Sequence, residues 1–129
     1  DSSVLSLWTK IPKTGNIVCI CSSLKDALCL WANTGIPSIA VQGEAYNISN
    51  TATNELKKRF KHVCVCYDND KPGLIDAKKI CEKTGFINII LPNENEAKDI
   101  SDYYKSLKDK ILFKQNLLHL FKDGIRTNI

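Results

Sequence analysis

Four short β-rich runs alternate with stretches of helical periodicity, and this alternation is the feature that most limits how the chain can fold. The runs cover Asn16–Cys21, Pro37–Val41, His62–Tyr67 and Ile87–Leu91. Strands separated by helices are typical of βαβ units and a parallel sheet. His62–Tyr67 is the most strand-like run, with the apolar character of a central parallel strand that is covered on both faces. The sequence therefore predicts an α/β fold with a four-stranded, mainly parallel sheet flanked by helices.

The helical stretches carry recognisable end signals. They cover Ser23–Thr34, Thr51–Phe60, Pro72–Thr84 and the C-terminal Ile100–Lys122. Gly35 and Gly85 stand where a left-handed residue usually ends a helix. Pro72 suits a first helical turn, and Asn50 or Thr51 is the expected N-cap of the second helix.

The length of 129 residues fits one domain. Residues 1–15 are predicted to be a linker or the remnant of a preceding domain, 16–104 the α/β domain, and 105–129 a helical extension. The sequence contains no methionine, which favours a segment of a longer chain. Since no apolar run approaches the ~20 residues that span a bilayer, no membrane association is predicted.

Six cysteines could suggest a disulfide framework or a metal site. Cys19 and Cys21 lie in the first predicted strand, and Cys64 and Cys66 lie in the third. Free cysteine in a buried strand behaves as a small apolar residue, and the two cysteines of each pair, two residues apart in a strand, share one face. We therefore expect core packing and a reducing, cytoplasmic compartment.

Two aspartates directly after the third strand give the sharpest chemical signal. The carboxyl ends of parallel strands meet at one sheet edge, where ligands of α/β folds bind. Asp68 and Asp70 would repel each other there, and a divalent cation such as Mg²⁺ removes that repulsion. The alternative is a polar turn whose aspartates cap the next helix. Spacing alone leaves both interpretations open.

The strand-end residues also resemble a known family. Asp68-Asn69-Asp70-Lys71-Pro72-Gly73 is similar to the D-x-D-x-x-G motif of Toprim domains, which occur in bacterial-type primases, topoisomerases and some nucleases. Ser22-Ser23-Leu24-Lys25-Asp26 occupies the place of the family's E-G-x-x-D motif. Lys98-Asp99-Ile100-Ser101-Asp102 resembles the K-D-x-x-D/E segment of primase members. The resemblance covers about Asn16 to Tyr104.

One departure from the family pattern concerns its first-motif glutamate, which is Ser22 here. The family's glutamate implies a metal ligand or a general acid/base, and a serine hydroxyl replaces it in neither role. Glu44 follows the second strand, next to Gly43, and could supply the missing carboxylate. An exposed loop glutamate is the alternative. We predict Asp68, Asp70 and Glu44 as catalytic and metal-binding residues.

Other polar residues at the same edge have two interpretations each. Lys25, Lys71, Lys98 and Asp99 are predicted to contact phosphates or substrate, although Asp99 could equally hold a second metal or cap a helix. Ser23 followed by Asp26 resembles a capping box, so a structural capping role is favoured for both.

The remaining candidates favour structural roles. Lys57, Lys58, Arg59 and Lys61 are typical of a solvated helix C-terminus, more than of a nucleic-acid surface. Trp8 could stack on bases, whereas Trp31 is expected in the core. Neither His62 nor His119 has a partner acid or nucleophile placed for catalysis, so structural roles are favoured for both.

The resemblance implies the metal-binding module of a phage or bacterial DNA primase, which supports nucleotidyl transfer with Mg²⁺ or Mn²⁺. Its expected partners are a nucleoside triphosphate, single-stranded DNA and other domains of the parent protein, such as a helicase or template-binding domain. A non-catalytic binding module and a Toprim nuclease remain open as alternatives. A phosphoacceptor receiver domain is set aside, because it needs an acid pair where Ser22 and Ser23 stand.

Overall fold

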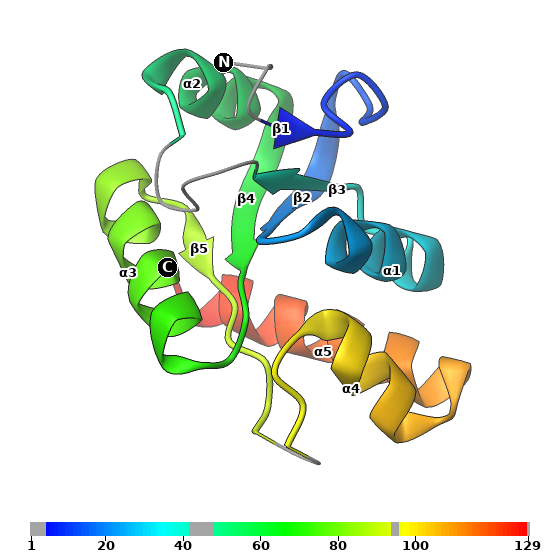
Figure 1. Cartoon of the computed structure of the whole chain (residues 1–129). Helices are drawn as coiled ribbons and strands as arrows, with labels where there is room; N and C mark the ends of the chain where they lie inside the picture. The colour runs from blue at the N-terminus through cyan, green and yellow to red at the C-terminus, as the bar shows by residue number, and fades with distance from the viewer. Residues whose placement is uncertain (1–4, 42–47, 94–95, 129) are drawn as a thin grey trace.

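The computed structural model describes residues 5–41, 48–93 and 96–128, and arranges them as a sheet between two groups of helices (Figure 1). The elements in chain order are β1 (Leu5–Ser6), β2 (Gly15–Cys21), α1 (Leu24–Thr34), β3 (Ser38–Val41), α2 (Asn50–Arg59), β4 (Phe60–Cys66), α3 (Lys71–Thr84), β5 (Ile87–Asn88), α4 (Ile100–Leu107) and α5 (Lys110–Thr127).

The sheet has the strand order β1-β3-β2-β4-β5. The four predicted strands β2, β3, β4 and β5 are parallel, which confirms the predicted α/β class. The short β1 adds an antiparallel edge strand on β3, from the region that was predicted as a linker. The central pair runs from Gly15 opposite Phe60 to Cys21 opposite Cys66, so β2 and β4 end side by side.

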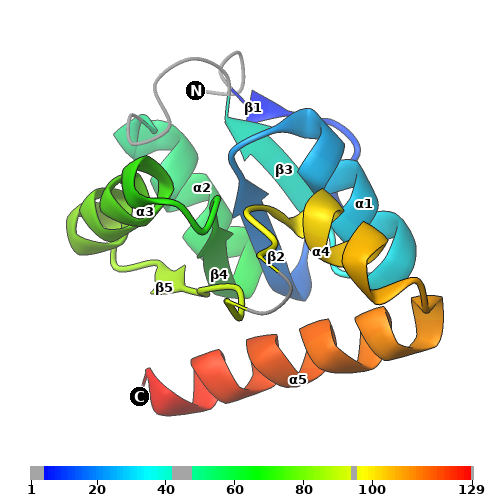
Figure 2. The same cartoon turned by 60° about the horizontal axis from the view of Figure 1, so that its bottom comes forward.

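Alternating residues of the two central strands serve separate cores. Val18 and Ile20 of β2 face a core with Leu56 of α2 and Ile80 of α3. Cys19 and Cys21 face the other core, which α1, α4 and α5 cover (Figure 2). Side chains that alternate across a strand require both faces to be covered when both are apolar.

The cysteines pack as the sequence predicts. All six are free, and those of the two C-x-C pairs are buried. Burial raises the pKa of the Cys64 thiol to about 12 and also raises the pKa of Cys66. Burial therefore favours the neutral thiol form of Cys64 and Cys66 in the core.

The stretch predicted to be helical over Ile100–Lys122 forms two helices, α4 and α5. Lys108 adopts a left-handed conformation with φ 53°, and the side chain of Asp109 then caps α5 by accepting a hydrogen bond from Leu112 N at 3.0 Å. The break lets α5 lay Phe113, Leu117 and Phe121 on the same core as the sheet.

Other boundaries move by a few residues. Ser49 caps α2 instead of Asn50 or Thr51, because its hydroxyl accepts from Ala52 N at 3.1 Å. The strand predicted over Ile87–Leu91 ends at Asn88, although Ile89 N still donates to Val65 O at 2.8 Å. Gly35 and Gly85 end α1 and α3 in the left-handed conformation, as predicted.

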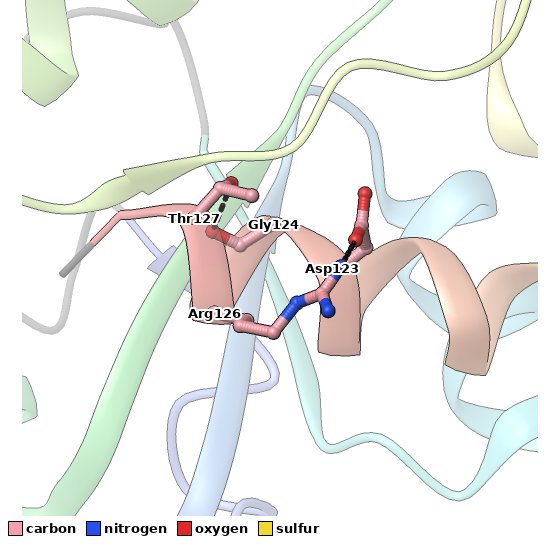
Figure 3. A network of polar contacts seen from close by, with 4 residues as sticks. All are labelled: Asp123, Gly124, Arg126 and Thr127. Carbon is pink, nitrogen blue, oxygen red and sulfur yellow. Dashed lines mark hydrogen bonds and ion pairs between the residues drawn. The ribbon is translucent and has the colours of Figure 1, made fainter.

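The last turn of α5 is closed by local polar contacts. Arg126 pairs with Asp123, and the Thr127 hydroxyl donates to Gly124 O at 3.3 Å (Figure 3). In the described ranges, no helix combines the length and the apolar character needed to cross a membrane.

Candidate metal centre

The site begins where β2 and β4 end, because this pairing brings Ser22 and Asp68 together. The Ser22 hydroxyl donates a hydrogen bond to Asp68 Oδ1 at 2.9 Å. Both residues are partly buried, and the last four residues of each of the two strands that carry them are buried. The rigid central strands therefore fix the position of the Asp68 carboxylate.

Asp26 lies in the first turn of α1 and is almost fully buried, with 2% of its surface exposed. Ser23 caps α1 as predicted, because its hydroxyl accepts from Asp26 N at 3.2 Å. The carboxylate of Asp26, however, is not used as the capping-box prediction supposed. Its Oδ1 accepts hydrogen bonds from Ser101 N at 3.0 Å and from Ser101 Oγ at 2.8 Å. The N–H of Ser101 is free to donate because it lies in the first turn of α4, where backbone N–H groups have no partner within the helix. The packing of α4 against α1 brings this N–H and the Ser101 hydroxyl to Asp26.

Asp99 brings a third carboxylate to the same place. It is the N-cap of α4, and its Oδ1 accepts from Asp102 N at 2.7 Å, as the capping alternative for this residue predicted. Asp26, Asp68 and Asp99 each offer a carboxylate oxygen, and these three oxygens all lie within 4.8 Å of one another. We call this group the carboxylate cluster.

The cluster concentrates negative charge. Burial raises the pKa of Asp68 above its ordinary value, and the neighbouring carboxylates of Asp26, Asp99 and Asp70 raise it further, whereas the hydrogen bond from Ser22 lowers it. Three hard oxygen donors at this spacing suit a divalent cation that prefers oxygen ligands. The donor set therefore fits Mg²⁺ or Mn²⁺.

Asp70 caps the helix that follows it, as the capping alternative for this turn predicted, and its metal-binding role stays a prediction. It is the N-cap of α3, and its Oδ1 accepts from Gly73 N at 2.8 Å. Asp70 and Asp68 still border one hollow of about 170 Å³, which is lined by Ser22, Tyr67, Asp68, Asp70, Pro72, Gly73 and Asp76. The close carboxylate partners of Asp68 are thus Asp26 and Asp99, while Asp70 lines the hollow beside them.

Gly73 explains why the turn after β4 needs a glycine. A Cβ atom at this position would lie 2.2 Å from the carbonyl oxygen of Asp68, which no side chain can tolerate. The first turn of α3 can therefore pack directly against the backbone that carries Asp68. This contact holds the end of β4 in place.

Asn69 connects the two halves of the site. Its backbone N–H donates to Lys98 O, and its side-chain Nδ2 donates to Leu91 O at 3.0 Å. The turn after β4 is thereby tied to both ends of the segment that leads from β5 to Asp99. This tie positions Asp99 against Asp68.

The lysines predicted to contact phosphates lie beside aspartates of the site in the chain. Lys25, Lys71 and Lys98 are all exposed, and each is the chain neighbour of an aspartate at the site. Glu44, the predicted substitute for the family's glutamate, lies outside the described residues. Its metal-binding role stays a prediction.

The sequence predicted Asp68 as a metal ligand, whereas it favoured a helix-capping role for Asp26. One feature of the sequence did point to Asp26: it stands at the position of the aspartate that ends the family's E-G-x-x-D motif. Helix periodicity could not show that the side chain points toward Asp68, because that direction depends on the packing of α1 against α4. Asp99 was singled out, with its role left open.

A parallel sheet whose carboxyl edge gathers three acidic side chains defines a candidate divalent-metal domain. The Toprim-like family matches residues 19–104, and the chain belongs to this family. This confirms the resemblance noted in the sequence. No curated protein shows a significant sequence match.

Two solved structures share the fold. The primase fragment of the bacteriophage T7 primase-helicase protein superposes with a TM-score of 0.61 at 14% identity, over 80% of this chain and 45% of that one. A chain in the structure of bacteriophage T7 lagging-strand DNA polymerase interacting with primase domains of two gp4 subunits gives a TM-score of 0.52 at 12% identity, over 78% and 56%. The chain thus spans about half the length of these relatives.

Proposed function

We propose that the chain is the metal-binding module of a primase-like protein and that it supports nucleotidyl transfer. The observation that carries this proposal is the carboxylate cluster, in which Asp26, Asp68 and Asp99 place oxygens within 4.8 Å of one another. These residues would hold Mg²⁺ or Mn²⁺. The ion would supply charge neutralisation at the phosphates of a nucleoside triphosphate during in-line displacement.

The residues around the cluster have separable roles in this proposal. Lys25, Lys71 and Lys98 would bind the phosphates of the substrate. Asp70 would border the substrate hollow and fix α3, and Glu44 would complete the metal shell. Single-stranded DNA and further domains of the parent protein, such as a helicase or template-binding domain, are the proposed partners. The similarity in fold to the phage primase fragment supports this assignment.

A second candidate is a module that binds metal without catalysing transfer. The hydrogen bond from Ser22 to Asp68 favours it, because Ser22 supplies neither a charge nor a proton-transfer group at this position. In this alternative the site binds a cation and an anionic ligand, and the chemistry belongs elsewhere in the parent protein.

Calorimetric titration with Mn²⁺ tests the shared metal site. We expect one binding event, weakened about tenfold or more, which is ~1.4 kcal/mol, in each of Asp26→Asn, Asp68→Asn and Asp99→Asn. Asparagine keeps an acceptor for the bonds from Ser101, Ser22 and Asp102, so the fold is preserved. Glu82→Gln, on the exposed side of α3, is the matched control and should bind as the original protein does.

The two candidates differ in activity. Primer synthesis by the parent protein that is lost in Asp68→Asn and retained in Glu82→Gln supports the enzyme. Mn²⁺ binding by the original protein, together with primer synthesis that is unchanged in Asp68→Asn, supports the binding module. Absence of Mn²⁺ binding in the original protein contradicts both.

A further inference from the structure

A second hollow lies at the opposite end of the sheet from the carboxylate cluster, where the segment before β2 meets the end of α2. It has a volume of about 560 Å³ and is lined by Trp8, Thr9, Ile11, Lys13, Glu55 and Arg59. In Figure 1 the blue segment before β2 and α2 lie at the top, while β2 and β4 run downward toward the carboxylate edge. We call this the Trp8 hollow.

Arg59 builds the wall of the hollow. Its guanidinium lies over the Trp8 ring, 5.5 Å from the centroid. The same group donates hydrogen bonds to Ile11 O at 3.2 Å, Pro12 O at 2.5 Å and Lys13 O at 3.1 Å. The indole is therefore held in a fixed place, and because it is only half-buried, part of its surface stays open to a ligand.

The charge of Arg59 is not cancelled by these contacts. Its hydrogen-bond partners are neutral carbonyl groups, and Arg59 forms no ion pair within the described part of the chain. An anion near the hollow therefore meets a fixed positive charge beside an aromatic ring. Glu55 is the one acid among the lining residues.

Further cations extend the positive surface beyond the hollow. Lys13 lines it and is exposed, and Lys58 and Lys61 are exposed on either side of Arg59 in the chain. Lys10 is exposed in the same segment as Trp8. The dipole of α2 accounts for cations in its last turn, but it does not account for Lys10, Lys13 or the fixed indole. Exposed cations that lie close in the chain to Trp8 and to Arg59 suit a chain of phosphates that carries bases.

We infer that the Trp8 hollow and its flanking lysines bind single-stranded nucleic acid. A base stacks on the open surface of Trp8, while the backbone phosphates lie along Lys13, Lys58 and Lys61. The choice of nucleic acid, among possible polyanions, rests on the proposed function. The binding itself needs no metal, because the hollow lies at the other end of the sheet from the carboxylate cluster.

Fluorescence anisotropy with a labelled oligothymidylate of about 12 nucleotides, in the presence of EDTA, tests the charges. Replacing Lys13, Lys58 and Lys61 together with glutamine should weaken binding at least about tenfold and reduce the salt dependence by about two counter-ions. The matched control replaces the exposed Lys105, Lys110 and Lys114 of α4 and α5, and should bind like the original protein. Equal weakening in both triple variants, or in neither, overturns the inference.

The fluorescence of Trp8 tests the stacking. In a Trp31→Phe background, Trp8 is the only tryptophan, and saturating oligothymidylate should quench its emission. An abasic oligomer of the same length and a duplex should bind more weakly and quench less, since neither offers an unstacked base. Unchanged Trp8 emission at saturation overturns the stacking arrangement.

The metal site gives an independent reference. Asp68→Asn should leave oligonucleotide binding in EDTA unchanged, while it weakens Mn²⁺ binding about tenfold or more. If the original protein does not bind Mn²⁺, the proposed function is contradicted, but the oligonucleotide-binding result is not affected. Loss of oligonucleotide binding in Asp68→Asn would instead overturn the location inferred here.

Discussion

The Ser22 hydroxyl donates a 2.9 Å hydrogen bond to Asp68 Oδ1, across 46 positions of sequence. At this strand end the Toprim family's first motif has a glutamate, whose charge would repel Asp68. The hydroxyl instead stabilises the charged form of Asp68 and so lowers its pKa, against the effect of burial and of the neighbouring carboxylates. The substitution therefore replaces a repulsive contact with an attractive one when no cation is bound.

Restoring the acid should separate metal affinity from stability. Ser22→Glu adds a carboxylate beside the carboxylate cluster, so we expect Mn²⁺ affinity to rise about tenfold, which is ~1.4 kcal/mol. The metal-free protein should lose stability through like-charge repulsion, with Tm lower by roughly 3 °C. Calorimetry and thermal unfolding, each with and without Mn²⁺, measure the two effects. A rise in metal-free Tm would contradict this account.

The raised pKa of Asp68 predicts an unusual pH dependence for the metal-free protein. Because the folded state binds this proton more tightly than the unfolded state, the contribution of Asp68 to stability is highest at low pH. It falls as pH rises through the ordinary aspartate pKa, near 4, and is fully lost above the raised value. Urea unfolding across this range should show the fall.

Asp68→Asn isolates this contribution. The variant keeps an acceptor for Ser22 but carries no charge, so it should be more stable than the original protein at neutral pH. The gain should stay below about 1 kcal/mol, because Asp68 is only partly buried and solvent screens its charge. The difference between the two proteins should vanish toward acidic pH. If the stability difference between the two proteins is the same at every pH, it arises from packing and not from the charge of Asp68.

Gly73 gives a steric prediction. Gly73→Ala places a methyl group 2.2 Å from Asp68 O, so the helix and the strand end must move apart. We expect a loss of about 3 kcal/mol in unfolding free energy and weaker Mn²⁺ binding. Gly35→Ala is the matched control, because its Cβ meets no atom within 4 Å and only the left-handed backbone is strained. That control should lose about 1 kcal/mol and bind Mn²⁺ normally.

The cysteines give a chemical prediction. Burial raises the pKa of Cys64 and of Cys81 to about 12, so few thiolates exist at neutral pH. Reaction of the native protein with a disulfide reagent should be at least about 100-fold slower than reaction of the unfolded protein, which should release six equivalents. Fewer than six equivalents after unfolding without reductant would contradict the assignment of free thiols.

The parallel core was accessible from sequence because local signals agree with the final structure. Gly35 and Gly85 end their helices in the left-handed conformation, and the apolar run before Asp68 forms the central β4. These features depend on backbone preferences and on apolar periodicity, and both are determined by residues that are close together in the sequence.

The arrangement of the site depended on contacts that local patterns do not contain. Asp26 accepts from Ser101, which is 75 positions away. The break at Lys108 has no glycine or proline to mark it, and the packing of α5 on the sheet is needed to favour it. The sequence therefore predicted which strand ends form the candidate site, whereas the tertiary packing determines which carboxylates lie close together.

Asn69 has a mechanical consequence. Because its amide and its side chain bind Lys98 O and Leu91 O, the β4–α3 turn and the segment leading to α4 must shift together. Any displacement of Asp99 that accompanies ligand entry is thus transmitted to the strand end that bears Asp68. The backbone and the side chain of one residue, Asn69, thus couple the position of Asp68 to that of Asp99.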